Sequence, residues 1–181
     1  FFSSSFLHVA VVGKRQGFPR SMLCFDGVCT QVDCSLEAPF SVPVTNFFCE
    51  LWLKTQTEKE CAVLYFGGRN SSVGLYLNAE YNDEDKAFKC RKGMLLLIVT
   101  DAQDRNLFGS INCYVSDNQW HHIVIKCSQE PAKWKAAVDG NLLHCDAYTS
   151  EWPPVFEAKP IMKKMVIGAS SGWNHFFGSI K

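Results

Sequence analysis

The chain has 181 residues, a length that suits a single domain spanning residues 1–181. Its 18 basic side chains balance 18 acidic ones, and no long run of one charge occurs. A neutral surface gives no attraction for a phosphate backbone, so the composition argues against nucleic-acid binding. No segment approaches the roughly 20 apolar residues that a membrane-spanning helix needs, and we predict no membrane contact by this domain.

The two ends of the sequence are its least informative parts. Residues 1–20 match no pattern beyond one candidate edge strand, Phe6–Val12, and their role stays open. The last residues, Phe176–Lys181, end inside a strand-like run. We therefore expect the chain to be a piece of a longer protein, truncated at its C-terminus.

Short apolar or alternating runs dominate the chain, and Gly, Asn, Asp, Pro and Ser separate them. No window keeps the helical spacing of apolar residues for more than about two turns. Many short strands at this spacing predict an all-β fold, either a sandwich or a barrel. The predicted strands are Phe6–Val12, Ser21–Asp26, Phe47–Thr55, Cys61–Gly67, Gly74–Asn78, Gly93–Thr100, Ser110–Val115, Trp120–Lys126, Lys133–Val138, Asn141–Cys145 and Lys164–Ile167.

Several connections between these strands can be predicted from their turn residues. Asp139-Gly140 lies between two apolar runs, where a tight hairpin turn requires positive φ. We expect a four-residue connection at Ser116–Gln119, a longer turn at Gly67–Ser72 and a solvated loop at Tyr81–Lys86. The aromatic content of 13% fits pleated strands and equally a binding face.

Six short pieces stand out in order along residues 23–180. They are Leu23–Gly27 followed by Val32, Asn46–Thr55, Asp117–Val124, Ala137–Gly140, Val166–Ala169 and Phe176–Ile180. Together they resemble the pieces found in laminin-G-like jelly rolls of the concanavalin-like superfamily. The resemblance implies a two-sheet antiparallel β-sandwich. It also implies structural roles in that fold for Phe25, Asp26, Gly27, Trp52, Trp120, His121, His122, Asp139, Gly140 and Gly178.

Within this superfamily the chain is similar to the extracellular laminin-G-like domain of calsyntenins. The resemblance implies an extracellular domain, or the ectodomain of a membrane protein. It rests on Cys90 ahead of Met94–Leu97, Cys113 ahead of Trp120–His122, and the runs Ser150–Pro153, Met165–Ala169 and Phe176–Gly178. Residues 1–20 depart from it, as do the additional cysteines Cys29, Cys34, Cys127 and Cys145.

The chain contains nine cysteines, and their redox state depends on the cellular compartment of the protein. Thiols persist in reducing compartments and disulfides in oxidising ones, and we favour the oxidising alternative mainly on the resemblance. The odd number leaves at least one thiol free or paired with another chain. Cys90 and Cys113 are the best candidate disulfide, closing a loop of about 20 residues worth roughly 3 kcal/mol. In a secreted chain, Asn70-Ser71-Ser72 is a candidate N-glycosylation site.

The segment Phe47–Lys54 carries the candidate ligand-binding residues. Strand periodicity places its apolar residues on one face and Phe48, Glu50, Trp52 and Lys54 on the other. On a concave sheet, Trp52 would stack on a sugar ring while Glu50 accepts hydrogen bonds from its hydroxyls. The alternative is a partly covered face from which Glu50 and Lys54 reach solvent.

Histidine and aspartate do not define a metal site in the sequence. His121 and His122 are adjacent on a strand and point to opposite faces, so they cannot chelate one ion together. Laminin-G-like domains often bind calcium at the sandwich rim through loop oxygens, which makes a structural calcium ion a candidate; no other cofactor is required. The aspartates at predicted strand ends are Asp26, Asp101, Asp104 and Asp117, and no spacing selects a ligand set among them.

Catalysis is not expected of this chain. Glycoside hydrolysis needs two positioned carboxylates, and acidic residues cluster only in Glu80–Asp85, without an alternating triad. The chain has no G-x-S-x-G motif and no nucleophile context for its cysteines. We therefore predict a non-catalytic adhesion or recognition module that binds a protein or a glycan. A carbohydrate-binding module attached to an enzyme is the alternative, and a glycoside hydrolase is a third, less favoured hypothesis.

Overall fold

The computed structural model describes residues 22–29, 31–41, 48–68, 71–83, 88–100, 105–127, 134–149, 161–170 and 174–180. These residues form strands and no helix, which confirms the predicted all-β class. Within them, no helix is long and apolar enough to cross a membrane. The predicted strand Phe6–Val12, the remainder of residues 1–20 and the candidate glycosylation site Asn70 lie outside the described residues.

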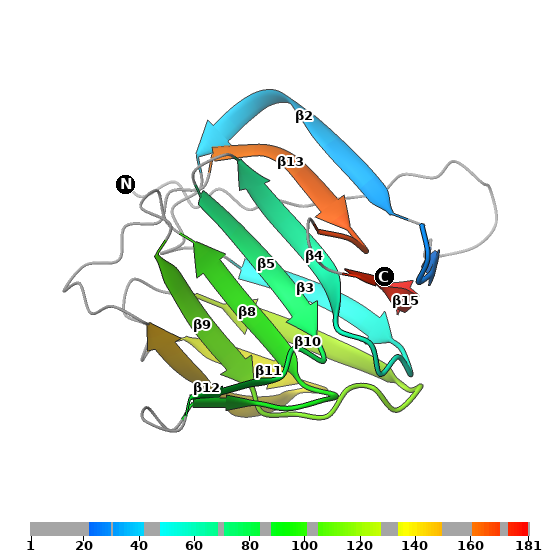
Figure 1. Ribbon diagram of the computed structural model, residues 1–181, viewed down its shortest axis with the longest axis vertical. Helices are drawn as coiled ribbons and strands as arrows, with labels where there is room; N and C mark the ends of the chain where they lie inside the picture. Colours follow the sequence, from blue (N-terminus) through cyan, green and yellow to red (C-terminus); the bar gives the residue numbers. More distant parts are fainter. Residues whose placement is uncertain are drawn as a thin grey trace.

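The described residues form fifteen strands, β1 to β15 in chain order (Figure 1). Their pattern follows the alternation of apolar and polar residues, as in β3, where every second side chain is buried. The strands are β1 (Leu23–Asp26), β2 (Val32–Ser41), β3 (Phe48–Lys54), β4 (Cys61–Gly68), β5 (Ser71–Leu77), β6 (Tyr81–Asp83), β7 (Phe88–Cys90), β8 (Leu95–Thr100), β9 (Asn106–Ile111), β10 (Trp120–Lys126), β11 (Lys135–Val138), β12 (Asn141–Thr149), β13 (Ile161–Ile167), β14 (Asn174–His175) and β15 (Phe177–Ile180).

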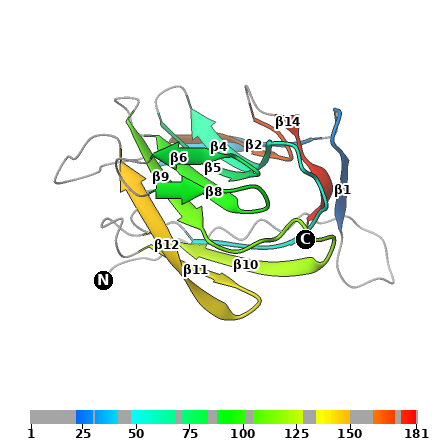
Figure 2. The same ribbon diagram turned by 60° about the horizontal axis from the view of Figure 1, so that its bottom comes forward.

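The strands build two packed antiparallel layers that are joined at one side. The first layer runs β1-β15-β3-β10-β11-β12, and the second runs β12-β9-β8-β5-β4-β13-β2. β12 belongs to both layers, because its first half pairs with β11 and its second half pairs with β9. Figure 2 shows β12 passing from the layer of β10 and β11 to the layer of β8 and β9. The predicted jelly-roll sandwich is confirmed, with one short parallel pairing between β14 and β4.

The main hydrophobic core fills the space between the two layers. Leu53 and Ile123 of the first layer meet Leu95, Leu97 and Ile111 of the second, and all five are almost fully buried. Burial of each such side chain contributes about 1.5–3 kcal/mol to folding. The apolar face of β3 therefore meets the core, and the opposite face of β3 is left for solvent or a ligand.

A smaller apolar cluster lies on the outer face of the second layer. It contains Tyr76 of β5, Leu96 of β8 and Cys90 at the end of β7. The Tyr76 ring lies directly over Gly74, where an added Cβ atom would come within 2.4 Å of the ring. The protein's own side chains therefore occupy this part of the outer face.

The structure does not form the predicted disulfide between Cys90 and Cys113. None of the eight cysteine side chains that the structure describes is bonded to another cysteine. Cys90 belongs to the outer cluster of the second layer, whereas Cys113 packs against the main core, so the two sulfur atoms lie on different sides of that layer. Burial raises the pKa of Cys49 and of Cys61 to about 12, with the Glu50 charge adding to the shift at Cys49. Thiols with so high a pKa are poor nucleophiles at neutral pH.

Four strands were not expected from the sequence: β2, β6, β7 and the two-residue β14. β2 contains Pro39 and two charged residues, Asp33 and Glu37, which break the apolar pattern. It lies at the edge of its layer and pairs only with β13 among the described strands, and edge strands tolerate proline because its missing N–H is not needed there. β6 and β7 form a two-stranded hairpin, so the predicted loop Tyr81–Lys86 begins as a strand.

Two further expectations about the chain path were wrong. The longer turn predicted at Gly67–Ser72 is partly strand, because β4 continues to Gly68 and β5 already starts at Ser71, which pairs with it. The strand predicted at Ser110–Val115 lies instead at Asn106–Ile111. Pairing with β8 on one side and β12 on the other sets this position, and the apolar pattern of one strand does not reveal its partners.

Candidate functional site

The outer face of the first layer carries the residues predicted to bind a ligand. Phe48, Glu50 and Trp52 of β3 point away from the core, and 50% of Phe48 and 39% of Trp52 remain exposed. The register between β3 and β10 places His122 opposite Trp52. We call these four residues the aromatic face.

The Trp52 indole is held in position by His122. The two ring centroids lie 4.9 Å apart, with 26° between the ring planes, which is a stacked arrangement. Nε2 of His122 lies 2.8 Å from Oε1 of Glu50, and this hydrogen bond fixes the imidazole ring. The aromatic face therefore presents a supported indole ring next to a carboxylate and an imidazole, which together offer stacking and hydrogen bonding.

The structure brings the predicted pair Glu50 and Trp52 together through a third residue. Both side chains contact His122, which the sequence analysis had assigned a structural role only. The alternation of side chains along β3 was enough to predict its outward-pointing face. Which residue of β10 lies opposite Trp52 depends on sheet register, which one sequence does not state. Trp120, the other aromatic residue of β10, lies opposite Lys54.

His121 lies between two carboxylates on the other side of β10. Its Nδ1 is 2.8 Å from Oδ2 of Asp139, its Nε2 is 2.9 Å from Oδ1 of Asp117, and 12% of its side chain is exposed. Asp139 also accepts the backbone N–H of His122. Asp139 and Gly140 have φ of 54° and 78°, which confirms the predicted tight turn. We call Asp117, His121 and Asp139 the histidine clamp, because they tie the loop before β10 to the turn after β11.

The charges of the histidine clamp stabilise one another. Burial acts to lower the pKa of His121, but the hydrogen bonds and charges of Asp117 and Asp139 outweigh it and raise this pKa overall. The hydrogen bond with His121 lowers the pKa of Asp117. Burial acts to raise the pKa of Asp139, but the hydrogen bonds from His122 and His121 lower it overall. The imidazolium form and both carboxylates are therefore favoured together.

No metal site forms among the described residues, where no group of three or more His, Cys, Asp or Glu side chains is placed to hold an ion. The Asp26 carboxylate accepts the backbone N–H groups of Val28 and Cys29. The Asp117 carboxylate is hydrogen-bonded within the histidine clamp. Both candidate calcium ligands that the structure describes are thus engaged in their own turns. Asp101 and Asp104 lie outside the described residues, and a calcium site that includes them stays a prediction.

The remaining residues of the family resemblance lie where β1 meets β15. The ring of Phe25 packs edge-on against Phe176, with centroids 5.7 Å apart. Gly27 has a φ of 73°, a left-handed conformation that favours glycine. Gly178 has a φ of 148°, and a Cβ atom there would lie 2.4 Å from the carbonyl oxygen of Lys54. These contacts give the residues packing and turn roles at one end of the sandwich.

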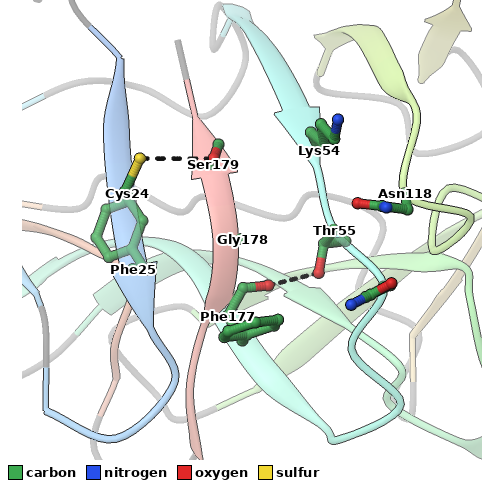
Figure 3. A pocket seen from close by; sticks show the side chains of 9 residues that line it. Cys24, Phe25, Lys54, Thr55, Asn118, Phe177, Gly178 and Ser179 are labelled. Atoms are coloured by element: carbon green, nitrogen blue, oxygen red, sulfur yellow. Dashed lines mark hydrogen bonds between the residues drawn. The ribbon is translucent and has the colours of Figure 1, made fainter.

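A cavity of about 280 Å³ opens at the same end, between β1, β15 and the end of β3 (Figure 3). The Thr55 hydroxyl donates to the Phe177 carbonyl oxygen over 2.5 Å, and the Asn118 N–H donates to the Thr55 carbonyl oxygen over 2.7 Å. These two hydrogen bonds tie the walls of the cavity together. Its polar and aromatic lining comes from Cys24, Lys54, Gln56, Asn118, Phe177 and Ser179. We call this the rim cavity.

Comparison with known proteins identifies the fold and nothing finer. No family model and no curated protein sequence matches the chain. Domains LG4-5 of the mouse laminin α1 chain match with a TM-score of 0.59 and 14% identity, over 96% of this chain and 44% of that one. The LG1-3 region of the laminin α2 chain matches with a TM-score of 0.62 and 13% identity, over 93% of this chain and 31% of that one. The chain has the laminin G fold.

The laminin G fold is shared with other jelly rolls among the solved structures. The SAP-like pentraxin of Limulus polyphemus matches with a TM-score of 0.54 and 12% identity, over 88% of this chain and 72% of that one. This chain spans less than half of each laminin structure, because those contain several domains. The resemblance predicted from six sequence pieces is therefore confirmed as a fold. None of the three structures named above is a calsyntenin.

Proposed function

We propose that this domain is a non-catalytic recognition module that binds a glycan through the aromatic face. The observation that carries the proposal is the exposed Trp52 ring, stacked on His122 and flanked by Glu50. Ligand sites combine apolar surface with a few placed polar groups. Here the indole ring supplies a flat surface for the apolar side of a sugar ring, and the carboxylate and imidazole supply partners for its hydroxyls.

The strands that carry the aromatic face contain few carboxylates, which favours binding over hydrolysis. β3, β10 and β11 together contain one acidic residue, Glu50. Both geometries of glycoside hydrolysis need two carboxylates flanking the scissile bond. Glu50 is also hydrogen-bonded to His122, which suits a carboxylate that orients a ligand.

Replacing Trp52 with alanine is expected to weaken glycan binding roughly 10- to 100-fold, because a large anchoring ring contributes much of the energy of a small site. A glycan array would identify the ligand, and titration calorimetry would compare the affinities of the parent and the variant. The matched control is Val28→Ala, an exposed apolar residue in the loop after β1, which should leave the affinity unchanged. Equal affinities for the parent and the Trp52 variant would refute the proposed site.

A protein partner is the second candidate for the same face. Phe48 is half exposed, and Leu142 of β12 is 71% exposed. The pairing of the strands places four residues next to one another in a row across the layer: Glu50, Val124, Ala137 and Leu142. Apolar residues spread over neighbouring strands suit a protein interface better than a single sugar. This candidate would be favoured if the domain bound no glycan on an array and if Trp52→Ala abolished binding of a protein partner.

The proposal places the domain in a larger extracellular or membrane-anchored protein, with calsyntenins as the subgroup to test. The laminin G fold and the sequence pieces around Cys90 and Cys113 support this setting. Sequencing the full-length chain is the direct test, since a signal peptide and cadherin-like repeats are expected before residue 1. Nine free thiols in the native protein would contradict an oxidising compartment.

A further inference from the structure

The rim cavity combines one cation with hydrogen-bond donors and has no acidic lining residue. Among the described residues that line it, Lys54 carries the single charge. Within the described part of the chain, no carboxylate pairs with the Lys54 ammonium group. The side-chain amides of Gln56 and Asn118 likewise form no hydrogen bond with any described residue. Such a set of unpaired donors around a cation is complementary to an anion.

The nearby acidic side chains do not neutralise this cation. Asp117 precedes Asn118 in the chain, but its carboxylate is held by His121 in the histidine clamp. Asp26 ends β1 and accepts the N–H groups of its own turn. The positive charge of Lys54 therefore remains available to a ligand.

The cavity also has an apolar wall and a fixed shape. The Phe177 ring is 44% exposed and lines the cavity next to Gly178. Figure 3 shows Phe177 and Thr55 facing each other across the hydrogen bond that joins β15 to the end of β3. A preformed cavity reduces the cost of ordering side chains when a ligand binds. The volume of about 280 Å³ is at the lower end for ligand cavities, so it suits a group of about one ring.

We propose that the rim cavity binds a carboxylate group attached to an apolar group of about one ring, at a site separate from the aromatic face. Lys54 is the counter-ion of the carboxylate, the amides of Gln56 and Asn118 donate hydrogen bonds to its oxygens, and the Phe177 ring packs against the apolar group. Such a ligand is either a free monocarboxylic acid or the C-terminal end of a peptide, since both present the same chemistry.

The test uses benzoate as the free acid and N-acetylphenylalanine as the chain end, with benzamide and N-acetylphenylalanine amide as their uncharged counterparts. Binding is followed by NMR on the isotope-labelled domain. We expect saturable shifts of the Gly178 and Ser179 backbone amides and the Asn118 side-chain amide, with Kd on the order of 1 mM. The amides should bind about tenfold more weakly, because they lack the charge that Lys54 recognises. Equal binding of acids and amides, or shifts elsewhere on the domain, would overturn the proposal.

Two lysine variants separate this site from general charge attraction. Lys54→Met keeps the length of the side chain and should weaken carboxylate binding about tenfold. Lys126→Met removes the same charge from an exposed position at the far end of β10 and should leave the affinity unchanged. Equal effects of both variants would overturn the proposal, and a thermal melt of each checks that the fold is kept. Tighter binding of benzoate supports a free acid as the ligand, and tighter binding of N-acetylphenylalanine supports a peptide end. Glycan binding at Trp52 is measured separately, so a negative result at one site does not decide the proposal for the other site.

Discussion

A Gly178→Ala variant is expected to lose roughly 2–4 kcal/mol of unfolding free energy, measured by urea denaturation. The added Cβ atom would lie 2.4 Å from the carbonyl oxygen of Lys54 and 2.7 Å from the ring of Phe176. The φ of 148° adds strain for any residue with a side chain. β15 joins β1 to β3, so moving its backbone to relieve the contact would disturb both neighbouring strands.

Gly140→Ala provides the matched control for this prediction. Gly140 has a φ of 78°, but a Cβ atom there would meet nothing within 4 Å. This variant should lose only about 1 kcal/mol, the cost of placing alanine in a left-handed conformation. The difference between the two variants measures the close approach of β15 to β3. Equal losses would mean that the backbone at Gly178 relaxes freely and that the contact with Lys54 is not tight.

Local patterns predicted the strands of the first layer well. β10 lies at Trp120–Lys126 as predicted, and β3 (Phe48–Lys54) lies within the predicted range Phe47–Thr55. Both strands alternate core and surface residues, so the pattern itself marks their length. β9 was predicted four residues too late, because its position depends on its pairing with β8 and β12. β2 was missed because edge strands lack a clear apolar face and can include proline, here Pro39.

The candidate site was predictable only where its residues belong to one strand. Period two along β3 placed Glu50 and Trp52 on one face, as found. His122 could not be added to them, because its neighbour across the strands is set by the register of β10. The rim cavity could not be predicted from the sequence. Cys24, Lys54 and Ser179 are far apart in the chain and line one cavity only because β15 lies between β1 and β3.

The histidine clamp is expected to make the stability of the domain depend on pH. The pKa of His121 is raised in the folded state, so its contribution is fully present below its ordinary value of 6.5 and is lost as pH rises through the folded pKa. The pKa values of Asp117 and Asp139 are lowered, so their contributions are present above the ordinary value of 3.8 and are lost as pH falls through the folded pKa values. The clamp therefore stabilises the fold most between these two ordinary values.

His121→Gln is expected to lower the unfolding free energy by roughly 1–3 kcal/mol at about pH 5.5, because two charge-assisted hydrogen bonds are lost. The deficit should shrink as pH rises through the folded pKa of His121, because the parent imidazole then loses its proton and its bonds to Asp117 and Asp139 lose their charge. Urea denaturation over a series of pH values upward from about 5.5 measures this change. A deficit that stays constant would show that His121 contributes by packing alone.

Asp117→Asn separates the charge of the clamp from its shape. The amide keeps the size of the side chain and removes one of the two negative charges facing His121. The pKa of His121, followed by NMR titration of its imidazole protons, should fall toward its ordinary value but remain supported by Asp139. The stability of this variant should accordingly be less pH-dependent than that of the parent above about pH 6.5. An unchanged His121 titration would mean that Asp139 alone holds the proton and that the loop before β10 is tied down by other contacts.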